Sequence, residues 1–227
     1  MTYNQEAEPD FSALAEGPIS PGLKACASIC ARSRLKRFID IAGSSFGLAV
    51  LTPGLSLIAL AIFLQDGGPV FYRQTRTGLD QKPFQVWKFR TMLHQKAKVP
   101  FEQTKGPDDP RVTRLGRLLR ALSLDELPQL FNVLVGEMSL VGPRPHPIEL
   151  DALLAPQFPA YTLRYCVKPG LTGQAQINGA RGPIITLADM QKRLQFDLQY
   201  IRDWSIRGDI TIILKTLRAL NAGKNAY

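Results

Sequence analysis

Residues 41–65 read IAGSSFGLAVLTPGLSLIALAIFLQ, and this run of 25 residues between Asp40 and Asp66 contains no charged side chain. As one α-helix it would be roughly 37 Å long, at about 1.5 Å per residue, which is enough to cross the hydrocarbon core of a bilayer. A buried core helix of a soluble protein seldom stays uncharged over such a length. The segment therefore predicts insertion into a membrane.

A proline interrupts the run almost at its centre, where the sequence reads Thr52-Pro53-Gly54. Proline removes one helical hydrogen bond and clashes with the preceding turn, and the glycine loosens the chain further. Each half is then about a dozen residues long, which is too short to span a bilayer. Basic residues precede and follow the run: Arg32, Arg34, Lys36 and Arg37, then Arg73, Arg76, Lys82, Lys88 and Arg90.

Basic flanks favour the cytoplasmic side of a membrane, so both ends of the segment are expected there. A helix that enters the membrane, bends at Pro53 and returns is consistent with both the break and the flanks. We therefore expect a re-entrant helix-break-helix over residues 32–66, with Thr52 and Pro53 at the break. A kinked helix that spans the membrane once stays open, because proline is tolerated in spanning helices.

The rest of the chain reads as a polar tail and one compact domain. Residues 1–31 are polar and contain prolines, and they lack the basic start and apolar core of a signal peptide, so a flexible tail is expected. Residues 67–227 are long enough for one hydrophobic core. The three cysteines, Cys26, Cys30 and Cys166, have no metal-ligand partners nearby and indicate a reducing compartment.

The charge balance of the chain is strongly basic, with a formal net charge of +9. A basic protein suits polyanions such as nucleic acid, anionic lipid or a phosphorylated substrate. The sequence contains no helix-turn-helix, zinc or stacking-aromatic pattern, and the long apolar segment also counts against a nucleic-acid binder. We therefore expect membrane lipids among the partners and no nucleic acid.

Local patterns after residue 67 predict a short β-hairpin. Residues 70–72 and 84–89 are typical of two strands, and the glycine and proline between 78 and 83 indicate the turn that joins them. Residues 93–110 are polar and contain three prolines, so we interpret them as a loop.

Helical periodicity accounts for most of the remaining domain. Apolar residues recur at helical spacing between 112 and 122 and again from 187 to 201. The second of these helices and the apolar-basic segment 210–220 could lie at a membrane interface, although core-facing helices fit equally well. The expected class is thus α/β, mostly helical with a short β-hairpin, next to the membrane segment.

The stretch Ser123-Leu-Asp125-Glu126-Leu-Pro128 holds two adjacent carboxylates and admits two interpretations. Ser123 and Glu126 match a capping box, and acidic residues favour a helix N-terminus in any case. Pro128 conflicts with that box, because it would be the fifth helical residue, where its missing N–H is already needed. If Pro128 instead starts the helix, Asp125 and Glu126 lie in the turn before it and are free to point elsewhere.

Three later loops combine glycine or proline with a cation. They are Gly142-Pro143-Arg144-Pro145, Lys168-Pro169-Gly170-Leu-Thr-Gly173 and Asn178-Gly179-Ala180-Arg181-Gly182. Such loops can bring backbone N–H groups and guanidinium groups close to phosphate. The same residues also make ordinary turns, and the sequence contains no P-loop or dinucleotide-binding fingerprint.

Seven short stretches follow one another in order over residues 34–220. They are Lys36-Arg37-x-x-Asp40, the broken apolar segment, Gly68-Pro-Val-Phe-Tyr72, Lys88-Phe-Arg90-Thr-Met92, Ser123-Leu-Asp-Glu-Leu-Pro-Gln-Leu130, Met138-Ser-x-Val-Gly-Pro-Arg-Pro145 and Lys168-Pro-Gly-x-Thr-Gly173. Each stretch alone is a weak signal, whereas seven in order are specific. Together they resemble the monotopic phosphoglycosyltransferases, the bacterial sugar transferases that begin glycan assembly on undecaprenyl phosphate.

The resemblance implies a catalytic domain over residues 67–227 at the cytoplasmic face of the bacterial inner membrane. It implies transfer of a sugar-1-phosphate, expected to be a hexose-1-phosphate, from a UDP-sugar to undecaprenyl phosphate, with release of UMP and the start of exopolysaccharide or other glycan assembly. By the same resemblance Asp125 is the nucleophile that forms a covalent phosphosugar-aspartate intermediate, and Glu126 helps to hold Mg²⁺. Four cations fall near the pair or the phosphates: Lys88, Arg120, Arg144 and, on weaker grounds, Arg181.

Two departures and one rival interpretation accompany this prediction. Gln174 replaces a tryptophan common in the family, and Ala180 separates Gly179 from Arg181, so the pocket around Arg181 is less closely matched. A non-catalytic membrane scaffold for polysaccharide-assembly partners would explain the basic charge and the apolar segment, but not the acidic pair beside Arg120. The identity of the sugar is not encoded in any motif, and a homo-oligomer stays open.

Overall fold

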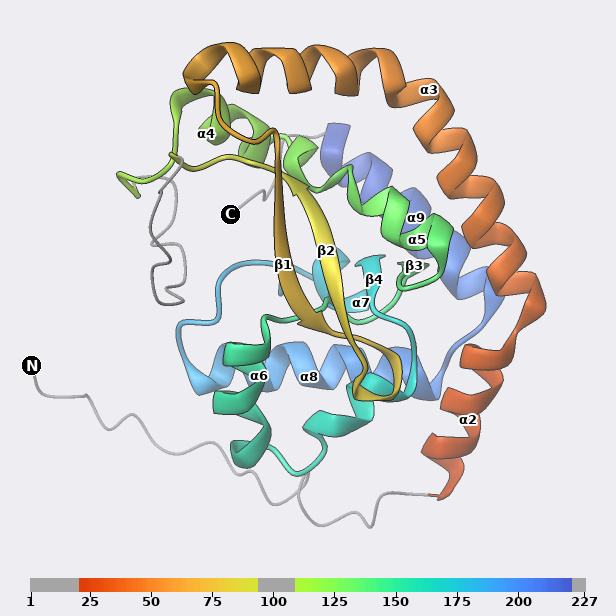
Figure 1. Cartoon of the computed structure of the whole chain (residues 1–227). Helices are drawn as coiled ribbons and strands as arrows, with labels where there is room; N and C mark the ends of the chain where they lie inside the picture. Colours follow the sequence, from red (N-terminus) through yellow and green to blue (C-terminus); the bar gives the residue numbers. More distant parts are fainter. Residues whose placement is uncertain (1–20, 94–108, 222–227) are drawn as a thin grey trace, which may run out of the picture.

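The computed structural model describes residues 21–93 and 109–221, and one long helix, α3 (Arg34–Asp66), frames the rest of the fold (Figure 1). The helix begins after Ser33, whose hydroxyl accepts a hydrogen bond from the Lys36 amide at 3.2 Å. It ends at Gly67, which adopts the left-handed conformation with φ 63°. Serine and left-handed glycine are the usual caps at the two ends of a helix, so the sequence defines both limits of α3.

Helix α3 passes through Pro53 without losing its helical backbone, and it bends near its middle (Figure 1). Pro53 lacks only one N–H, and the Thr52 hydroxyl donates a hydrogen bond to the Leu48 carbonyl at 2.6 Å. Both features favour a bend in a continuous helix. The structure thus has one continuous, bent helix where a helix-break-helix is expected, and the re-entrant path through the membrane stays a prediction.

The outer surface of α3 is apolar and uncovered. Within residues 21–93 and 109–221 it is the one helix that is long and apolar enough to cross a membrane, and only 6% of its most apolar stretch is buried. A core helix of a soluble protein would be covered, and an apolar surface of this extent indicates membrane association. Its exposed large side chains are Leu35, Phe38, Ile41, Phe46, Val50, Leu57, Leu60, Phe63 and Leu64.

Helix α2 (Pro21–Arg32) precedes α3, so the prediction of a flexible tail is wrong for this part of residues 1–31. Ala27 and Cys30 are buried and pack against the two C-terminal helices of the chain. Because these partners are distant in sequence, local composition could not indicate the helix. Residues 1–20 lie outside the described residues.

The predicted β-hairpin is confirmed by two antiparallel strands, β1 (Phe71–Thr77) and β2 (Pro83–Phe89), of which β1 is longer than expected. Their pairing sets Tyr72 opposite Lys88. A second, parallel pair joins β3 (Ser139–Val141) and β4 (Gly170–Thr172). Strands of three residues are too short for a periodic pattern to indicate them.

Helices and single helical turns form most of the remaining described chain, which confirms the mostly helical α/β class. The predicted helices between 112 and 122 and from 187 onward are confirmed, whereas the predicted loop at 93–110 lies largely outside the described residues. In chain order the elements are η1 (Leu79–Gln81), α4 (Arg114–Ala121), η2 (Leu124–Glu126), α5 (Gln129–Val135), α6 (Ile148–Leu154), η3 (Ala155–Gln157), η4 (Tyr161–Cys166), α7 (Gln174–Ile177), α8 (Leu187–Arg202) and α9 (Ile206–Asn221).

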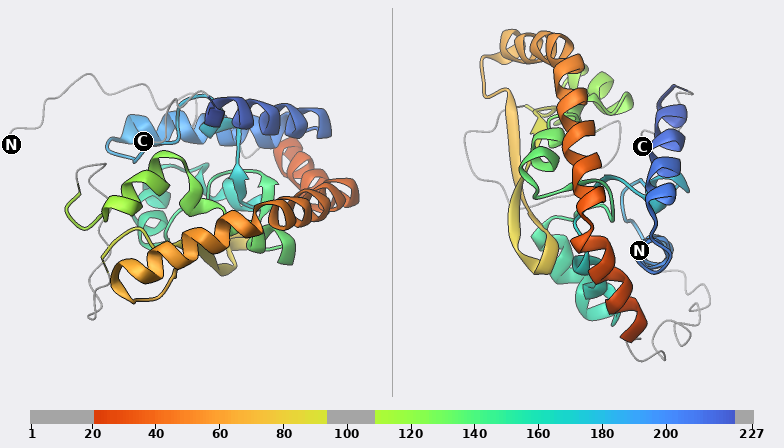
Figure 2. Two further views of the ribbon diagram at one scale, coloured as in Figure 1. Left: turned by 90° about the horizontal axis from the view of Figure 1, so that it is seen from above. Right: turned by 90° about the vertical axis from the view of Figure 1, so that its right-hand side faces the viewer.

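Helices α8 and α9 lie on one side of the fold and the β1–β2 hairpin on the other (Figure 2). Helix α8 faces the core, because Met190 and Leu194 are fully buried in one hydrophobic cluster. Helix α9 buries Ile212 but leaves an apolar face exposed at Ile210 and Leu214. The core-facing interpretation is therefore confirmed for α8, and α9 keeps one apolar face open.

The start of α3 is fastened to the core by polar side chains. Lys36 Nζ forms an ion pair with Asp209 Oδ2 of α9 at 2.7 Å, and Asp40 Oδ1 accepts a hydrogen bond from Ser139 Oγ of β3 at 2.9 Å. Arg37 donates to the last carbonyls of α5, with both distances 2.7 Å. Helix α3 thereby fixes α5, which follows the acidic pair in the chain, and β3, which precedes Arg144.

Candidate active site

The two adjacent carboxylates lie on η2, a single turn between α4 and α5. Pro128 directly precedes α5, so the interpretation in which this proline starts the helix is confirmed. The capping-box interpretation is wrong, because Ser123 is left-handed with φ 59° and its side chain makes no cap hydrogen bond within the described chain. Both acids are largely buried, with exposures of 9% for Asp125 and 7% for Glu126.

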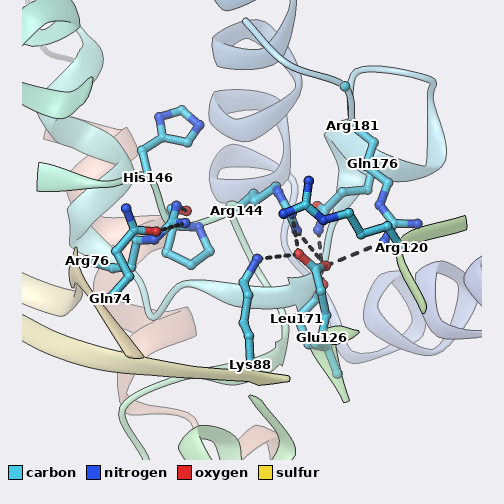
Figure 3. Close-up of polar contacts among 12 residues, drawn as sticks. Gln74, Arg76, Lys88, Arg120, Glu126, Arg144, His146, Leu171, Gln176 and Arg181 are labelled. Carbon is cyan, nitrogen blue, oxygen red and sulfur yellow. Dashed lines mark hydrogen bonds and ion pairs between the residues drawn. The ribbon is translucent and has the colours of Figure 1, made fainter. Parts of the chain in front are cut away.

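Three cations from three separate segments converge on Glu126 (Figure 3). Lys88 of β2 donates to Oε1 at 2.7 Å, and Arg144, after β3, reaches Oε1 at 2.5 Å and Oε2 at 2.9 Å. Arg181, after α7, lies 3.4 Å from Oε2. Each oxygen of Glu126 therefore receives two donors, which is the usual capacity of a carboxylate oxygen.

The cations decide the charge state of Glu126. Burial raises the pKa of its carboxyl, but the charges of Arg144 and Lys88 outweigh burial and hold the pKa well below its usual value of 4.5. Burial lowers the pKa of Arg144, and the ion pair with Glu126 more than offsets this, so the pKa of Arg144 is raised. Glu126 is thus a permanent anion that gathers three cations around the turn.

Asp125 stands beside this saturated carboxylate, but it makes no hydrogen bond or ion pair with residues 21–93 and 109–221. Burial and the negative charge of Glu126 raise the pKa of Asp125 from 3.8 to about 6, against the charges of Lys88, Arg120 and Arg144. At neutral pH it is ionised, close to cations and without a direct partner among the described residues. These are the properties of a carboxylate that can act as a nucleophile.

Arg120 of α4 completes the cationic surroundings of the pair. Its charge lowers the pKa of Asp125, and its Nε donates to Thr91 Oγ1 at 2.8 Å. The structure therefore brings the four predicted cations, Lys88, Arg120, Arg144 and Arg181, around the predicted acidic pair, and their roles stay predictions. Thr52 and Pro53, which were predicted at the break of the apolar segment and not at this site, lie within α3.

The residues that hold Arg144 in place were missed from the sequence. Arg164 Nη2 donates to the Arg144 carbonyl at 2.7 Å, and Arg76 Nη1 donates to the neighbouring Pro145 carbonyl at 2.8 Å. Arg164 is itself paired with Asp197 at 2.8 Å. The sequence shows Arg76 only as a basic flank of the apolar segment, and no local pattern indicates that an arginine turns inward to a loop carbonyl.

The acidic pair is also the place to test for a metal ion. In the part of the chain that the structure describes, no three His, Cys, Asp or Glu residues form a metal-binding group. Mg²⁺ usually needs only one or two carboxylates, because water and substrate phosphates complete its shell. Asp125 is open, whereas Glu126 would exchange one of its cations, of which Arg181 at 3.4 Å is the most distant. The pair therefore fits Mg²⁺ bound together with a phosphate ligand.

Comparison with known proteins identifies relatives over nearly the whole described chain. The "UDP-glucose:undecaprenyl-phosphate glucose-1-phosphate transferase" of Escherichia coli (strain K12) is 50% identical over 194 residues, which are 85% of this chain. The "Undecaprenyl-phosphate glucose phosphotransferase" of Komagataeibacter xylinus is 48% identical over 195 residues, also 85% of the chain. A protein of Caulobacter vibrioides with the same name as the E. coli relative is 47% identical over 192 residues and 85% of the chain.

These relatives differ in length. The matched region is 41% of the E. coli protein and 37% of the Komagataeibacter protein, so this chain spans about two fifths of their length, but it is 72% of the Caulobacter protein. The sequence pattern of the family described as "Bacterial sugar transferase" matches residues 31–223, which include the acidic pair and all four surrounding cations. The chain therefore belongs to the bacterial sugar transferase family.

Proposed function

We propose that this protein transfers a hexose-1-phosphate from a UDP-sugar to undecaprenyl phosphate and thereby starts exopolysaccharide or other glycan assembly. The three relatives described above carry glucose in their names, so UDP-glucose is the donor we propose first. The observation that supports the reaction best is the contrast within the acidic pair. Glu126 is saturated by three cations, whereas Asp125 beside it is ionised at neutral pH and unpaired in the described chain.

In the first step a carboxylate oxygen of Asp125 attacks the phosphorus that carries the sugar. The bond between this phosphorus and the bridging oxygen breaks, and UMP leaves with the electron pair as a phosphate dianion. The sugar-1-phosphate is then joined to Asp125 as a mixed anhydride. The total charge is the same on both sides, so the step needs no proton donor or acceptor.

In the second step a phosphate oxygen of undecaprenyl phosphate attacks the same phosphorus. The bond to Asp125 breaks, the carboxylate is restored, and the product is the lipid diphosphate sugar. A covalent intermediate suits this pair of substrates, because one is soluble and the other is held in lipid. Asp125 lies on η2, where the neighbouring Leu124 packs in a hydrophobic cluster with Ile62 of α3, and α5, which follows this turn, is hydrogen-bonded to Arg37 of α3. We propose that α3 enters the inner membrane from the cytoplasmic face and returns there.

The cations around the pair supply most of the electrostatic catalysis. A diphosphate repels a carboxylate nucleophile unless its charge is neutralised, and a fixed arginine or lysine does this without reorganisation. Lys88 and Arg144 are held by Glu126 in a fixed arrangement close to Asp125, where we propose that the diphosphate binds. Glu126 and Asp125 would hold Mg²⁺, which supplies further neutralisation of the phosphate oxygens when it is bound.

A non-catalytic membrane scaffold is the alternative function. It would use the exposed apolar surface of α3 and the basic body of the protein, but it would gain nothing from Asp125, a buried carboxylate with no ion pair among the described residues. Burial of a charge without a direct partner lowers stability, so its presence indicates a chemical role.

UMP release separates the two functions. Purified protein in nanodiscs is given Mg²⁺, undecaprenyl phosphate and, one at a time, UDP-glucose, UDP-galactose and their N-acetylated forms. We expect release of UMP that needs the lipid phosphate for sustained turnover and falls by about 10³-fold or more in Asp125→Asn. Asp203→Asn, at an exposed aspartate, is the matched control and should keep full activity. A folded protein that releases no UMP from any of these donors would support the scaffold.

The covalent intermediate has its own test. Incubation with UDP-glucose that carries a radiolabelled sugar, without undecaprenyl phosphate, should leave label on the protein. Hydroxylamine should remove the label because it cleaves a mixed carboxylic-phosphoric anhydride, and undecaprenyl phosphate should transfer it to lipid. A wild-type enzyme that turns over but never becomes labelled would indicate direct transfer between the two substrates.

A further inference from the structure

A buried arginine of α8, Arg193, directs its guanidinium at the loop that carries Arg181. Arg193 is only 5% exposed, and its Nε donates to the Ala180 carbonyl at 2.9 Å. Its Nη2 donates to the Gly182 carbonyl at 2.5 Å. One side chain therefore binds the carbonyls on both sides of Arg181.

The third guanidinium nitrogen of Arg193 reaches a histidine, His146, on the segment that carries Arg144. Arg193 Nη1 lies 3.2 Å from His146 Nε2, and His146 Nδ1 lies 2.7 Å from the Tyr161 hydroxyl. The Tyr161 hydroxyl donates its hydrogen to Asp151 at 2.6 Å, so it accepts from Nδ1–H and leaves Nε2 to accept from Arg193. His146 is thus a neutral link, because burial and the nearby arginines hold its pKa well below 6.5.

The same histidine lies next to the arginine that holds Arg144. Arg164 Nη1 is 3.1 Å from His146 Nδ1, and Arg164 Nη2 donates to the Arg144 carbonyl at 2.7 Å. His146 therefore stands between two arginines, one bound to each cation-bearing segment. The His146 side chain is itself buried.

The placement of Arg193 is electrostatically unfavourable, which argues for a specific role. Burial and the charges of Arg144 and Arg164 lower the pKa of Arg193 to about 10, although Asp197 opposes this. Two of its three donor nitrogens bind backbone carbonyls. A planar guanidinium can bind two carbonyls at once in a fixed geometry, which a lysine cannot do.

The loop held by Arg193 would otherwise be poorly fixed. Gly179 adopts the left-handed conformation with φ 78°, and Gly182 follows Arg181 directly, so both neighbours of the sequence Ala180-Arg181 are glycines. The contact of Arg181 with Glu126 is the longest in the cation cluster at 3.4 Å, and the Arg181 side chain is 25% exposed. Arg181 is consequently the cation of this cluster most easily transferred to a ligand.

We infer that Arg193 is a positioning residue that holds the loop on both sides of Arg181 and thereby presents the Arg181 guanidinium to the diphosphate of the nucleotide sugar. The inference rests on the proposed function, because it takes a nucleoside diphosphate sugar as the ligand. On binding, Arg181 exchanges its long contact with Glu126 for a phosphate oxygen, while Arg193 keeps the loop backbone where it is.

A double-mutant cycle tests whether Arg193 acts through Arg181. In the full-length protein we expect Arg181→Ala and Arg193→Gln each to raise the KM for UDP-glucose by about 10-fold, with a smaller change in kcat. The double variant should be no worse than Arg181→Ala alone, since residues that act through one another are not additive. Lys192→Gln, at the exposed neighbour on the same helix, should leave KM unchanged.

Arg193→Lys tests whether a raised KM is only the result of a less stable fold. This variant keeps the charge but cannot bind both carbonyls, so we expect a raised KM with a Tm close to that of the wild type. Fully additive losses in the double variant would overturn the inference, as would variants of Arg193 that lower Tm and leave KM unchanged.

Equilibrium binding separates this inference from the proposed reaction. UDP-glucose affinity is measured by calorimetry in an Asp125→Asn background, where no turnover is needed, and the same variants should weaken binding by similar factors without adding. A wild-type protein that binds UDP-glucose but never releases UMP would contradict the proposed function alone. Binding that neither Arg181→Ala nor Arg193→Gln alters would contradict the role of Arg193 alone.

Discussion

Helix α3 and the interior behind the candidate active site both reverse the usual arrangement of a soluble protein, in which apolar side chains are buried and charged side chains are exposed. Along α3, large apolar side chains such as Phe46 and Leu64 are 71% and 72% exposed. Behind the acidic pair, charged side chains such as those of Arg164 and Asp197 are 2% and 1% exposed. The apolar surface faces outward and much of the charge faces inward.

The surroundings of each region explain its unusual polarity. Exposed apolar surface is stable where lipid replaces water, so α3 takes its outward polarity from the membrane. Buried charge is stable only where partners and hydrogen bonds compensate its desolvation, and it then holds a site in a fixed geometry. In this protein the buried charges hold loops that carry further cations, as Arg164 holds Arg144.

Removal of the central anion should have the largest effect on the charged interior. Glu126→Gln leaves Lys88, Arg144 and Arg181 close together without a compensating charge. Loss of one member of a buried ion pair is expected to lower the free energy of unfolding by about 3 kcal/mol or more. For a chain of this size that corresponds to a fall in Tm of roughly 6 °C or more.

The matched control for this experiment is Glu149→Gln, because Glu149 is exposed on α6. Thermal unfolding in detergent without substrate compares the two variants with the wild type. A Tm for Glu126→Gln as high as that of Glu149→Gln would show that the three cations do not depend on Glu126.

Removal of the other carboxylate, that of Asp125, should have the opposite effect and stabilise the protein, by an amount that depends on pH. Asp125 has its pKa raised from 3.8 to about 6 in the folded protein, so the folded state binds its proton more tightly than the unfolded state does. The free energy of unfolding must then fall as pH rises from about 4 to about 6, by an amount on the order of 3 kcal/mol. Asp125→Asn removes this loss, so it should stabilise the protein at neutral pH.

Thermal unfolding with EDTA measures this effect at several pH values. We expect Tm of Asp125→Asn to match the wild type near pH 4 and to exceed it at pH 7. Asp203→Asn should show no such gain, because the hydrogen bond with Arg202 lowers the pKa of Asp203. A stability difference for Asp125→Asn that is constant over this range would contradict the raised pKa of Asp125.

A charge on the apolar surface of α3 should weaken membrane binding and leave folding intact. Leu57 is 69% exposed, so Leu57→Lys disturbs little packing, but a lysine in the hydrocarbon region costs about 2.5 to 3.5 kcal/mol. Vesicle flotation should show a loss of bound protein, whereas Ile185→Lys, at a site outside α3 that is 79% exposed, should bind as the wild type does. Equal losses in both variants would mean that α3 has no special role.

The sequence predicts best those features that local rules determine. The strand at residues 84–89 follows from a short apolar and aromatic run after a glycine- and proline-containing turn, and the turn that carries Asp125 follows from Pro128, which cannot lie deeper in a helix. The sequence could not decide between a break and a bend of α3 at Pro53, because one lost hydrogen bond bends a helix and need not end it.

Contacts between distant segments account for the rest. Helix α2 forms because Ala27 and Cys30 find partners on α8 and α9, which composition does not reveal. The role of Arg193 depends on the carbonyls of Ala180 and Gly182, and an amphipathic pattern does not distinguish an arginine that turns inward from one that stays in solvent.

The smallest expected effect comes from an ion pair that has the same chemistry as the buried ones and none of their surroundings. Arg202 Nε lies 2.9 Å from Asp203 Oδ1, but the two side chains are 65% and 53% exposed. The side chains of Arg164 and Asp197 are only 2% and 1% exposed. Water already solvates the exposed pair, so Arg202→Ala should leave Tm unchanged within error. Arg164→Ala should lower Tm clearly, because it leaves Asp197 buried without its charge partner and frees the Arg144 carbonyl. If the two variants lost the same stability, burial would not be what distinguishes the charges behind the active site from those on the surface.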